Sequence, residues 1–179
     1  MSETLLAAEA PLLPIRIYPD PALRKVARPV TNADKDEICA LVPSMFATMY
    51  KAPGIGLAAT QVGKLLRVMV LDVAGKDESP RPLVLINPEI TAKSEETATQ
   101  QEGCLSIPDQ YADVTRPARV KMRYQDLQGI KQEIEADGLL AACLQHELDH
   151  LNGVLFVDYL SALKRNMLLR KLAKALKEH

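Results

Sequence analysis

The most regular hydrophobic pattern in the chain lies between residues 139 and 151, where apolar side chains recur at the spacing of an α-helix. Asp137 precedes this segment in the position of an N-terminal cap, and Asn152-Gly153 follows it with a left-handed turn that commonly ends a helix. The apolar positions cover a broad surface: Leu139, Leu140, Cys143, Leu144, Leu148 and Leu151. The pattern therefore predicts a helix that is buried on most of its sides.

A second helical pattern lies between residues 38 and 49, where apolar side chains follow one side only. These positions are Ile38, Leu41, Val42, Met45 and Met49. Pro43 lies inside the segment, and because proline lacks a backbone N–H we expect it to bend or divide the helix. Cys39 is expected to be an inert thiol in the core or at its boundary. The preceding residues 11–30 are rich in proline and are predicted to be extended or turning chain.

Between these two helices the pattern becomes that of β-strands. Residues 65–73 and 83–88 are almost continuously apolar, as in strands whose two faces are both buried. Residues 89–101 are polar and are predicted to form an exposed strand or loop. Residues 120–124 and 130–134 alternate apolar and polar side chains on either side of a turn, which predicts a hairpin with one face in water.

The predicted elements follow the order helix, several strands, helix, with hairpin-like connections and no repeated strand–helix–strand unit. This order predicts the α+β class, with largely antiparallel β-sheets packed around a central helix. Residues 1–179 are predicted to form a single domain, with residues 1–13 as a candidate disordered tail. Residues 161–179 are predicted to form a C-terminal amphipathic helix. Its apolar stripe would consist of Leu163, Met167, Leu168, Leu172 and Leu176, and its cations of Lys164, Arg165, Arg170, Lys171, Lys174 and Lys177.

The composition limits the class of protein more than it identifies a function. Of the 179 residues, 47% are hydrophobic and 25% are charged, as in an ordinary globular protein. The 22 basic and 23 acidic side chains give a net charge of −1, which offers no argument for binding DNA or a membrane. No apolar run approaches the ~20 residues of a membrane-spanning helix, and the N-terminus does not resemble a signal peptide. Three cysteines, an odd number, favour a reducing cytoplasm over a disulfide framework.

The central predicted helix contains the motif His146-Glu147-Leu148-Asp149-His150. Histidines four residues apart lie on one face of a helix, with Cβ atoms ~5–6 Å apart, so both imidazoles can bind one metal ion. Glu147 is adjacent and can reach a water molecule at that metal. The alternative is that two core or surface histidines fall four residues apart by chance, although two buried imidazoles without partners would be costly. The third histidine of the chain is the terminal His179.

A metal site of this kind needs a third protein ligand, and two cysteines are candidates. Cys104 follows a glycine in the short segment 102–108, and Cys143 lies three residues before His146 on the same predicted helix. A thiolate and two imidazoles suit zinc or ferrous iron, with a fourth position left for water. The spacing alone favours neither cysteine.

A glycine-rich segment follows the first predicted helix. Gly54-x-Gly56-x-x-Ala59 mimics a dinucleotide-binding fingerprint, and Asp72 lies near the distance expected of a ribose-binding acid. That fingerprint requires a strand before the glycines, whereas here a helix precedes them. We therefore interpret the glycines as positions where the backbone runs close to a neighbouring strand or to a bound peptide.

Three segments together resemble the sequence motifs of the peptide deformylase family, and they occur in the family's order. They are Gly54-Ile55-Gly56-Leu57-Ala58-Ala59-Thr60-Gln61, Glu102-Gly103-Cys104-Leu105-Ser106 and Gln145-His146-Glu147-Leu148-Asp149-His150. The resemblance extends from about Pro14 to the C-terminal helix. Local departures from the pattern occur at Pro43, Gln100 and Tyr111, none of which is a position expected to do chemistry.

The resemblance implies a metal-dependent hydrolase that removes the formyl group from the N-terminal formylmethionine of nascent polypeptides. It implies that Cys104, His146 and His150 bind one divalent metal ion, with ferrous iron (Fe2+) expected and Zn2+, Ni2+ or Co2+ able to replace it. Under this assignment Cys143 becomes a wall residue of the substrate pocket.

The resemblance also implies roles for the residues around the metal. Glu147 would be the general acid/base, and the Gln61 side chain and the backbone N–H of Leu105 would donate to the developing oxyanion. The residues implied to contact substrate are Ile55, Gly56, Leu139 and Cys143. Glu102 and Arg116 are implied to be a buried pair that supports the cysteine loop.

Two rival functions share part of these motifs. One is a metallopeptidase that cleaves ordinary peptide bonds, and the other is a non-catalytic, ribosome-associated module with a structural metal. Glu147 and Gln61 argue against the second, because a structural site requires neither a base nor an oxyanion donor. The resemblance also allows the basic helix 161–179 to bind ribosomal RNA, whereas the simpler interpretation is a surface helix docked by its leucines.

Overall fold

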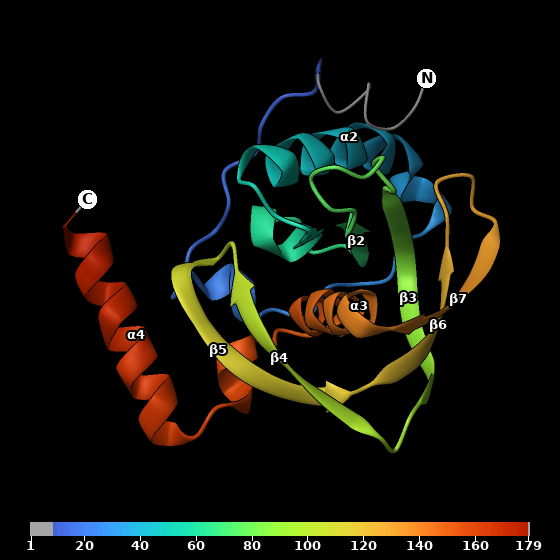
Figure 1. Ribbon diagram of the computed structural model, residues 1–179. Helices are drawn as coiled ribbons and strands as arrows, with labels where there is room; N and C mark the ends of the chain where they lie inside the picture. The colour runs from blue at the N-terminus through green and yellow to red at the C-terminus, as the bar shows by residue number, and fades with distance from the viewer. Residues whose placement is uncertain (1–8, 179) are drawn as a thin grey trace.

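The computed structural model describes residues 9–178, which form two antiparallel sheets with helices packed against them (Figure 1). The larger sheet has the strand order β1-β2-β3-β6-β7, and the smaller sheet pairs β4 with β5. The strands are β1 (Gly56–Ala58), β2 (Val68–Leu71), β3 (Leu83–Lys93), β4 (Thr97–Cys104), β5 (Ile107–Pro117), β6 (Arg119–Gln125) and β7 (Lys131–Asp137). The helices are η1 (Pro21–Arg24), η2 (Asn32–Asp34), α2 (Lys35–Lys51), η3 (Ala59–Val62), α3 (Gly138–Leu151), η4 (Phe156–Tyr159) and α4 (Ala162–Lys177). The predicted α+β class is confirmed.

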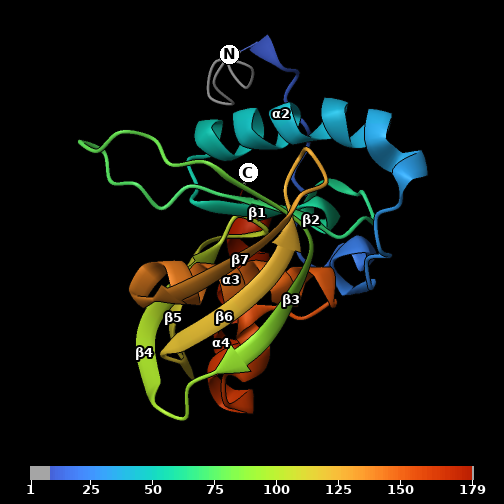
Figure 2. The same ribbon diagram turned by 90° about the vertical axis from the view of Figure 1, so that its right-hand side faces the viewer.

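Helices α2 and α3 pack on opposite faces of the larger sheet. Side chains alternate in direction along a strand, so successive residues of β2 enter different cores. Val68 and Val70 pack with α2, whereas Met69 and Leu71 pack with α3. All four residues of β2 are therefore buried, which accounts for the continuous apolar run in the sequence. Figures 1 and 2 show α3 near the centre, enclosed by strands of both sheets, and α2 on the far side of β2.

The first predicted helix is longer than its apolar pattern, and proline does not divide it. Helix α2 continues through Pro43 as one helix of 17 residues. The proline removes the backbone N–H that would have donated to the carbonyl of Cys39. The prediction for Cys39 itself is wrong, since its side chain is exposed. It lies on the solvent side of α2, while the apolar positions of the pattern, from Ile38 to Met49, are buried against the sheet.

The polar segment 89–101 belongs to two strands joined by a tight connection. Strand β3 continues to Lys93 and β4 begins at Thr97, and most of the side chains in this region are exposed. The predicted hairpin that follows is confirmed as β6 and β7, with Tyr124 opposite Gln132. This hairpin leads directly into α3, as expected from the sequence.

Of the predicted N-terminal tail, residues 1–8 lie outside the described part of the chain. At the end of the predicted tail, which is residue 13, the backbone N–H of Leu13 donates to Thr48 Oγ1 at 2.9 Å. The backbone N–H of Arg16 donates to the carbonyl of Gln61 at 2.7 Å. The chain that enters the domain is therefore attached first to α2 and then to η3.

Helix α4 packs through a narrower stripe than the sequence predicts. Leu168 and Leu172 are buried in a cluster with β5 and η4. Leu163, Met167 and Leu176 are 70%, 49% and 41% exposed, so the predicted stripe is wrong at these positions. Figure 1 shows the reason, because α4 lies at the edge of the molecule with one side against the rest. Across residues 9–178, no helix has both the length and the apolar character to cross a membrane.

Truncation of Leu172 tests this docking. Leu172→Ala should lower the free energy of unfolding by about 2–5 kcal/mol, because it removes a fully buried side chain. Leu163→Ala, in the same helix but exposed, is the matched control and should change that free energy by less than about 0.5 kcal/mol. Urea unfolding followed by circular dichroism measures both values. Equal effects of the two substitutions would contradict the described packing of α4.

Candidate metal and active site

Local backbone geometry fixes the C-terminal end of α3. Asp137 precedes the helix as predicted, but its side chain makes no capping hydrogen bond. At the other end, Gly153 has a φ of +74°, in the left-handed region that glycine adopts without strain. A Cβ atom at this position would lie 2.6 Å from the carbonyl oxygen of Arg24. The chain therefore leaves the helix directly after the histidine motif, and this exit requires glycine.

The structure brings Cys104, His146 and His150 together. Cys104 ends β4 at a register shift with β5, while both histidines come from α3. Cys104 Sγ lies 3.2 Å from His150 Nε2, and that nitrogen lies 3.2 Å from His146 Nε2. The three ligand atoms all lie within 4.8 Å of one another. A thiolate and two imidazoles at this separation fit a zinc or ferrous ion, with one coordination position left open.

The competing cysteine, Cys143, does not join this cluster. Its thiol lies 3.8 Å from the carbonyl oxygen of Ile55, on the side of α3 that faces β1. Burial raises the pKa of the Cys143 thiol well above its usual value, and the neighbouring Glu147 raises it further. The thiol is therefore held protonated, as a weak donor rather than a ligand. Of the two candidate cysteines, Cys104 is the one whose sulfur lies beside the histidines.

Glu102 and Arg116 form the predicted buried pair. Arg116 donates to both carboxylate oxygens of Glu102, at 2.6 and 2.9 Å. The same carboxylate lies 2.9 Å from His146 Nδ1. Burial alone would raise the pKa of Glu102, but the hydrogen bonds from Arg116 and His146 outweigh it and lower the pKa to about 2. An ionised Glu102 accepts from His146 Nδ1 and leaves Nε2 directed at the cluster.

Asp149 and Tyr159 extend this network, and the sequence reasoning did not identify them. Arg116 Nη1 and the Tyr159 hydroxyl both donate to Asp149 Oδ2, each at 2.8 Å. The guanidinium carbon of Arg116 also lies 4.7 Å from the centroid of the Tyr159 ring. The position of Asp149 between the two histidines was a signal that could have been used. Tyr159 carries no such signal, because its partners are distant in the sequence.

Glu147 is almost fully buried, and no hydrogen bond within the described residues reaches its Oε2. Its Oε1 lies 3.9 Å from His146 Nε2. Burial raises the pKa of this carboxyl to about 7, because it outweighs the opposing charges of His146 and Arg116. Gly56 provides the space for the side chain, because a Cβ atom at that position would lie 2.7 Å from Glu147 Oε1. The glycine pattern predicted an approach to a neighbouring strand or a bound peptide; Gly56 does pair with Leu71 of β2, and it also leaves room for side chains of α3, which was not predicted.

Gln61 in η3 directs its side-chain amide at the cluster. Gln61 Oε1 accepts from the backbone N–H of Ala58 at 2.9 Å, so Nε2 is the group that faces inward. Nε2 donates to Ser106 Oγ at 3.1 Å and to Cys104 Sγ at 3.5 Å. Ser106 is fully buried and was not singled out by the sequence reasoning, although it lies within the cysteine motif. Together these contacts place an N–H donor beside Cys104.

A cavity of about 110 Å³ opens beside Cys104, His146 and Glu147. Of the other residues predicted to belong to the site, five line it: Ile55, Gln61, Leu105, Leu139 and Cys143. Gly56 does not line the cavity and lies behind it, against Glu147 and Cys143. The structure thus gathers predicted residues from the segment before β1, from η3, from the β4–β5 connection and from α3 around one small space.

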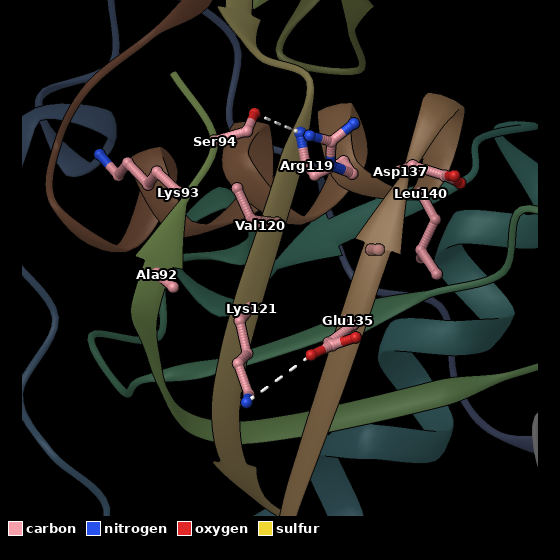
Figure 3. A pocket seen from close by; sticks show the side chains of 10 residues that line it. Ala92, Lys93, Ser94, Arg119, Val120, Lys121, Glu135, Asp137 and Leu140 are labelled. Carbon is pink, nitrogen blue, oxygen red and sulfur yellow. Dashed lines mark hydrogen bonds and ion pairs between the residues drawn. The ribbon is translucent and has the colours of Figure 1, made fainter. Parts of the chain in front are cut away.

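A larger hollow of about 600 Å³ lies elsewhere, at the ends of β3, β6 and β7 (Figure 3). Polar groups along it already have partners: Lys121 Nζ lies 3.6 Å from Glu135 Oε1, and the backbone N–H of Arg119 donates to Ser94 Oγ at 3.0 Å. None of the ten residues drawn there is a histidine or a cysteine. The candidate site is therefore the smaller cavity beside the cluster.

A helix that carries His-Glu-x-x-His, completed by a cysteine from another element and faced by an amide donor, is an arrangement typical of metal-dependent hydrolases. A family model described as polypeptide deformylase matches residues 12–166. The peptide deformylase of Mesorhizobium japonicum is 54% identical over 168 residues, which cover 94% of this chain and 95% of that protein. The peptide deformylase of Rhizobium meliloti is 56% identical over 164 residues, which cover 92% and 94%.

Solved structures of peptide deformylases are also similar to this chain. A peptide deformylase from Legionella pneumophila superposes with a TM-score of 0.87 and 45% identity, covering 93% of this chain and 96% of that chain. A peptide deformylase from Synechococcus elongatus, in complex with actinonin, superposes with a TM-score of 0.85 and 48% identity, covering 91% and 89%. The chain belongs to the polypeptide deformylase family. Its activity is hydrolysis of the formyl group from N-terminal formylmethionine, and family membership implies a metal ion.

Gly56→Ala tests the close contact between β1 and α3. The added methyl group should displace Glu147 and Cys143, and we expect the deformylation rate to fall by about 10²-fold while the fold is retained. Steady-state kinetics with a formyl-methionyl peptide and circular dichroism provide the two measurements. Gly75→Ala is the control, because its nearest neighbour is the exposed side chain of Glu78. Full activity in Gly56→Ala would show that the contact is unimportant.

Proposed function

We propose that Cys104, His146 and His150 hold one divalent metal ion, with ferrous iron (Fe2+) as the resident ion and Zn2+, Ni2+ or Co2+ as substitutes. The observation that carries the proposal is that three suitable ligand atoms, from two separate elements, lie within 4.8 Å of one another. A donor set of one thiolate and two imidazoles is suited to iron or zinc. When bound, such an ion polarises a carbonyl oxygen and lowers the pKa of water to about 7.

Glu147 is the general acid/base of this proposal. Its carboxylate accepts a proton from the attacking water and returns it to the amine nitrogen of methionine as the C–N bond of the formamide breaks. The supporting observation is geometric: Glu147 lines the cavity beside His146, and its Oε2 has no hydrogen-bond partner among the described residues. A buried oxygen without a partner is available to a water molecule in the cavity.

Gln61 and Leu105 stabilise the oxygen that becomes negatively charged when water attacks the formyl carbon. The bond from the N–H of Ala58 to Gln61 Oε1 orients Nε2, and the long contact of Nε2 with Cys104 Sγ, at 3.5 Å, is the one that it gives up to the oxyanion. Leu105 follows Cys104 directly and lines the same cavity, where its backbone N–H is the second donor. Donors fixed in this way act on the transition state more than on the substrate.

The peptide is bound by the glycine segment and the apolar side of the cavity. Ile55 and Gly56 border the peptide backbone, which adds alongside them as an extended strand. Leu139 and Cys143 line the space for the methionine side chain. Backbone contacts place few demands on the residues after methionine, so one site can accept many nascent chains.

Formate release from a formyl-methionyl peptide tests the proposal. Protein loaded with Fe2+ or Ni2+ without oxygen should release formate, and Glu147→Gln should lower the rate by about 10²–10⁴-fold, because the base is lost. The metal content of the variant should equal that of the wild type, and Glu135→Gln, an exposed acid of β7, is the control. Retained activity in Glu147→Gln would refute the assigned base. Cleavage of the unformylated peptide would instead indicate a metallopeptidase.

The C-terminal helix α4 is proposed to bind the ribosome, where the nascent substrate emerges, which would also place the protein in the cytoplasm. Five cations of this helix are exposed: Lys164, Arg170, Lys171, Lys174 and Lys177. Glu178 is the one acid between residues 161 and 179. A cationic face of this kind is attracted to the phosphate backbone of RNA.

Charge reversal in α4 tests ribosome binding without removing the docked leucines. Lys171→Glu/Lys174→Glu should reduce co-sedimentation with ribosomes, and the binding of the wild type should weaken as salt is raised. Lys76→Glu, in the exposed connection between β2 and β3, is the control. Unchanged co-sedimentation of the double variant would leave α4 as a surface helix only, without bearing on the deformylase site.

A further inference from the structure

We propose that Tyr50 and Asp72 position the segment 51–55, and thereby set the affinity for the peptide without taking part in the chemical step. The inference rests on the deformylase function and on the role proposed above for Ile55. Neither Tyr50 nor Asp72 lines the cavity. Both are therefore positioning residues, which act on the peptide site through the backbone of residues 51–55.

Asp72 is a buried carboxylate that joins three parts of the chain. It follows β2 directly and is 6% exposed. Its Oδ2 accepts from the Tyr50 hydroxyl at 2.6 Å, and its Oδ1 accepts from the backbone N–H of Ala74 at 3.0 Å. The backbone N–H of Arg81 lies 3.2 Å from each of the two oxygens. These contacts attach the end of β2 to α2 and to both ends of the β2–β3 connection.

The backbone of the same residue holds the segment that borders the cavity. The N–H of Asp72 donates to the carbonyl of Ile55 at 2.8 Å. Tyr50 is the penultimate residue of α2, so residues 51–55 run between two points that are both attached to Asp72. Most of this segment is exposed, and it depends on a few contacts for its position. One of these is the bond from the N–H of Gly54 to the carbonyl of Met49, at 2.7 Å.

The contacts separate peptide binding from the chemical step. Gly56, which lies against Glu147, is held independently because it pairs with Leu71 in the β1–β2 ladder. A shift of residues 51–55 would move Ile55 but leave Gly56 and the general base in place. The Tyr50 ring also stacks on Phe46, with centroids 5.9 Å apart, so loss of the hydroxyl alone keeps the ring packing. The expected result is a change in KM without a comparable change in kcat.

Kinetics of Tyr50→Phe and Asp72→Asn with a formyl-methionyl tripeptide test the inference. Each variant should raise KM by about five- to tenfold, the equivalent of one lost hydrogen bond, while kcat changes by less than about twofold. The double variant should raise KM by less than the product of the two single effects, because both substitutions act on the same contact between the Tyr50 hydroxyl and the side chain of residue 72. Thermal melting of each variant records any loss of stability separately.

Thr48→Val is the matched control. It removes another hydroxyl of α2, which donates to the carbonyl of Ser44 at 2.7 Å and accepts from the N–H of Leu13. This variant should lower the melting temperature while leaving KM unchanged. An unchanged KM in Tyr50→Phe and Asp72→Asn, or an equal rise in Thr48→Val, would overturn the inference and leave the deformylase function intact. Absence of formate release by the metal-loaded wild type would overturn both.

Discussion

The geometry of the site depends on the ionised carboxylate of Glu102 and its contacts with Arg116 and His146. This carboxylate lies on β4, accepts two hydrogen bonds from Arg116 on β5, and orients the ring of His146 on α3. A buried charge without a partner costs several kcal/mol, so neither the guanidinium nor the carboxylate can be accommodated alone. Because Cys104 lies two residues after Glu102 on the same strand, the ion pair also fixes how the cysteine approaches the histidines.

The same surroundings affect two carboxyl groups in opposite ways. Glu102 and Glu147 are both buried, at 8% and 3% exposure, and burial opposes the charge of each. Glu102 meets a guanidinium and an imidazole, which more than offset this effect. Glu147 receives no hydrogen bond from a cation among the described residues; the charge of His146 opposes the effect of burial on its pKa, and the negative charge of Glu102 adds to that effect. The surroundings of the two carboxyl groups thus lower the pKa of Glu102 and raise the pKa of Glu147.

Sequence patterns predicted the elements that depend on nearby residues. The spacing over 139–151 predicted α3 and its end, and the alternation before it predicted the hairpin. Local patterns could not identify the cysteine that lies beside the two histidines. The Cys143 thiol is close to His146 along the chain but faces Ile55, whereas Cys104 comes from the distant β4–β5 sheet. For the same reason the partners of Tyr159 were missed. The stripe on α4 was overestimated because periodicity shows which side is apolar, not whether another element covers it.

Strand β2 has no polar face, so alternation of polar and apolar side chains cannot fix its register. Because both faces are apolar, sliding it by one residue would exchange one set of valine and methionine side chains for another at little cost in burial. The polar residues at its two ends have no such freedom. Arg67 donates to the carbonyls of Ala27 and Leu151 and to Asn152 Oδ1, and Asp72 accepts from Tyr50. Two hydrophilic residues at its ends therefore help to hold β2, the second strand of the five-stranded sheet, in its observed alignment.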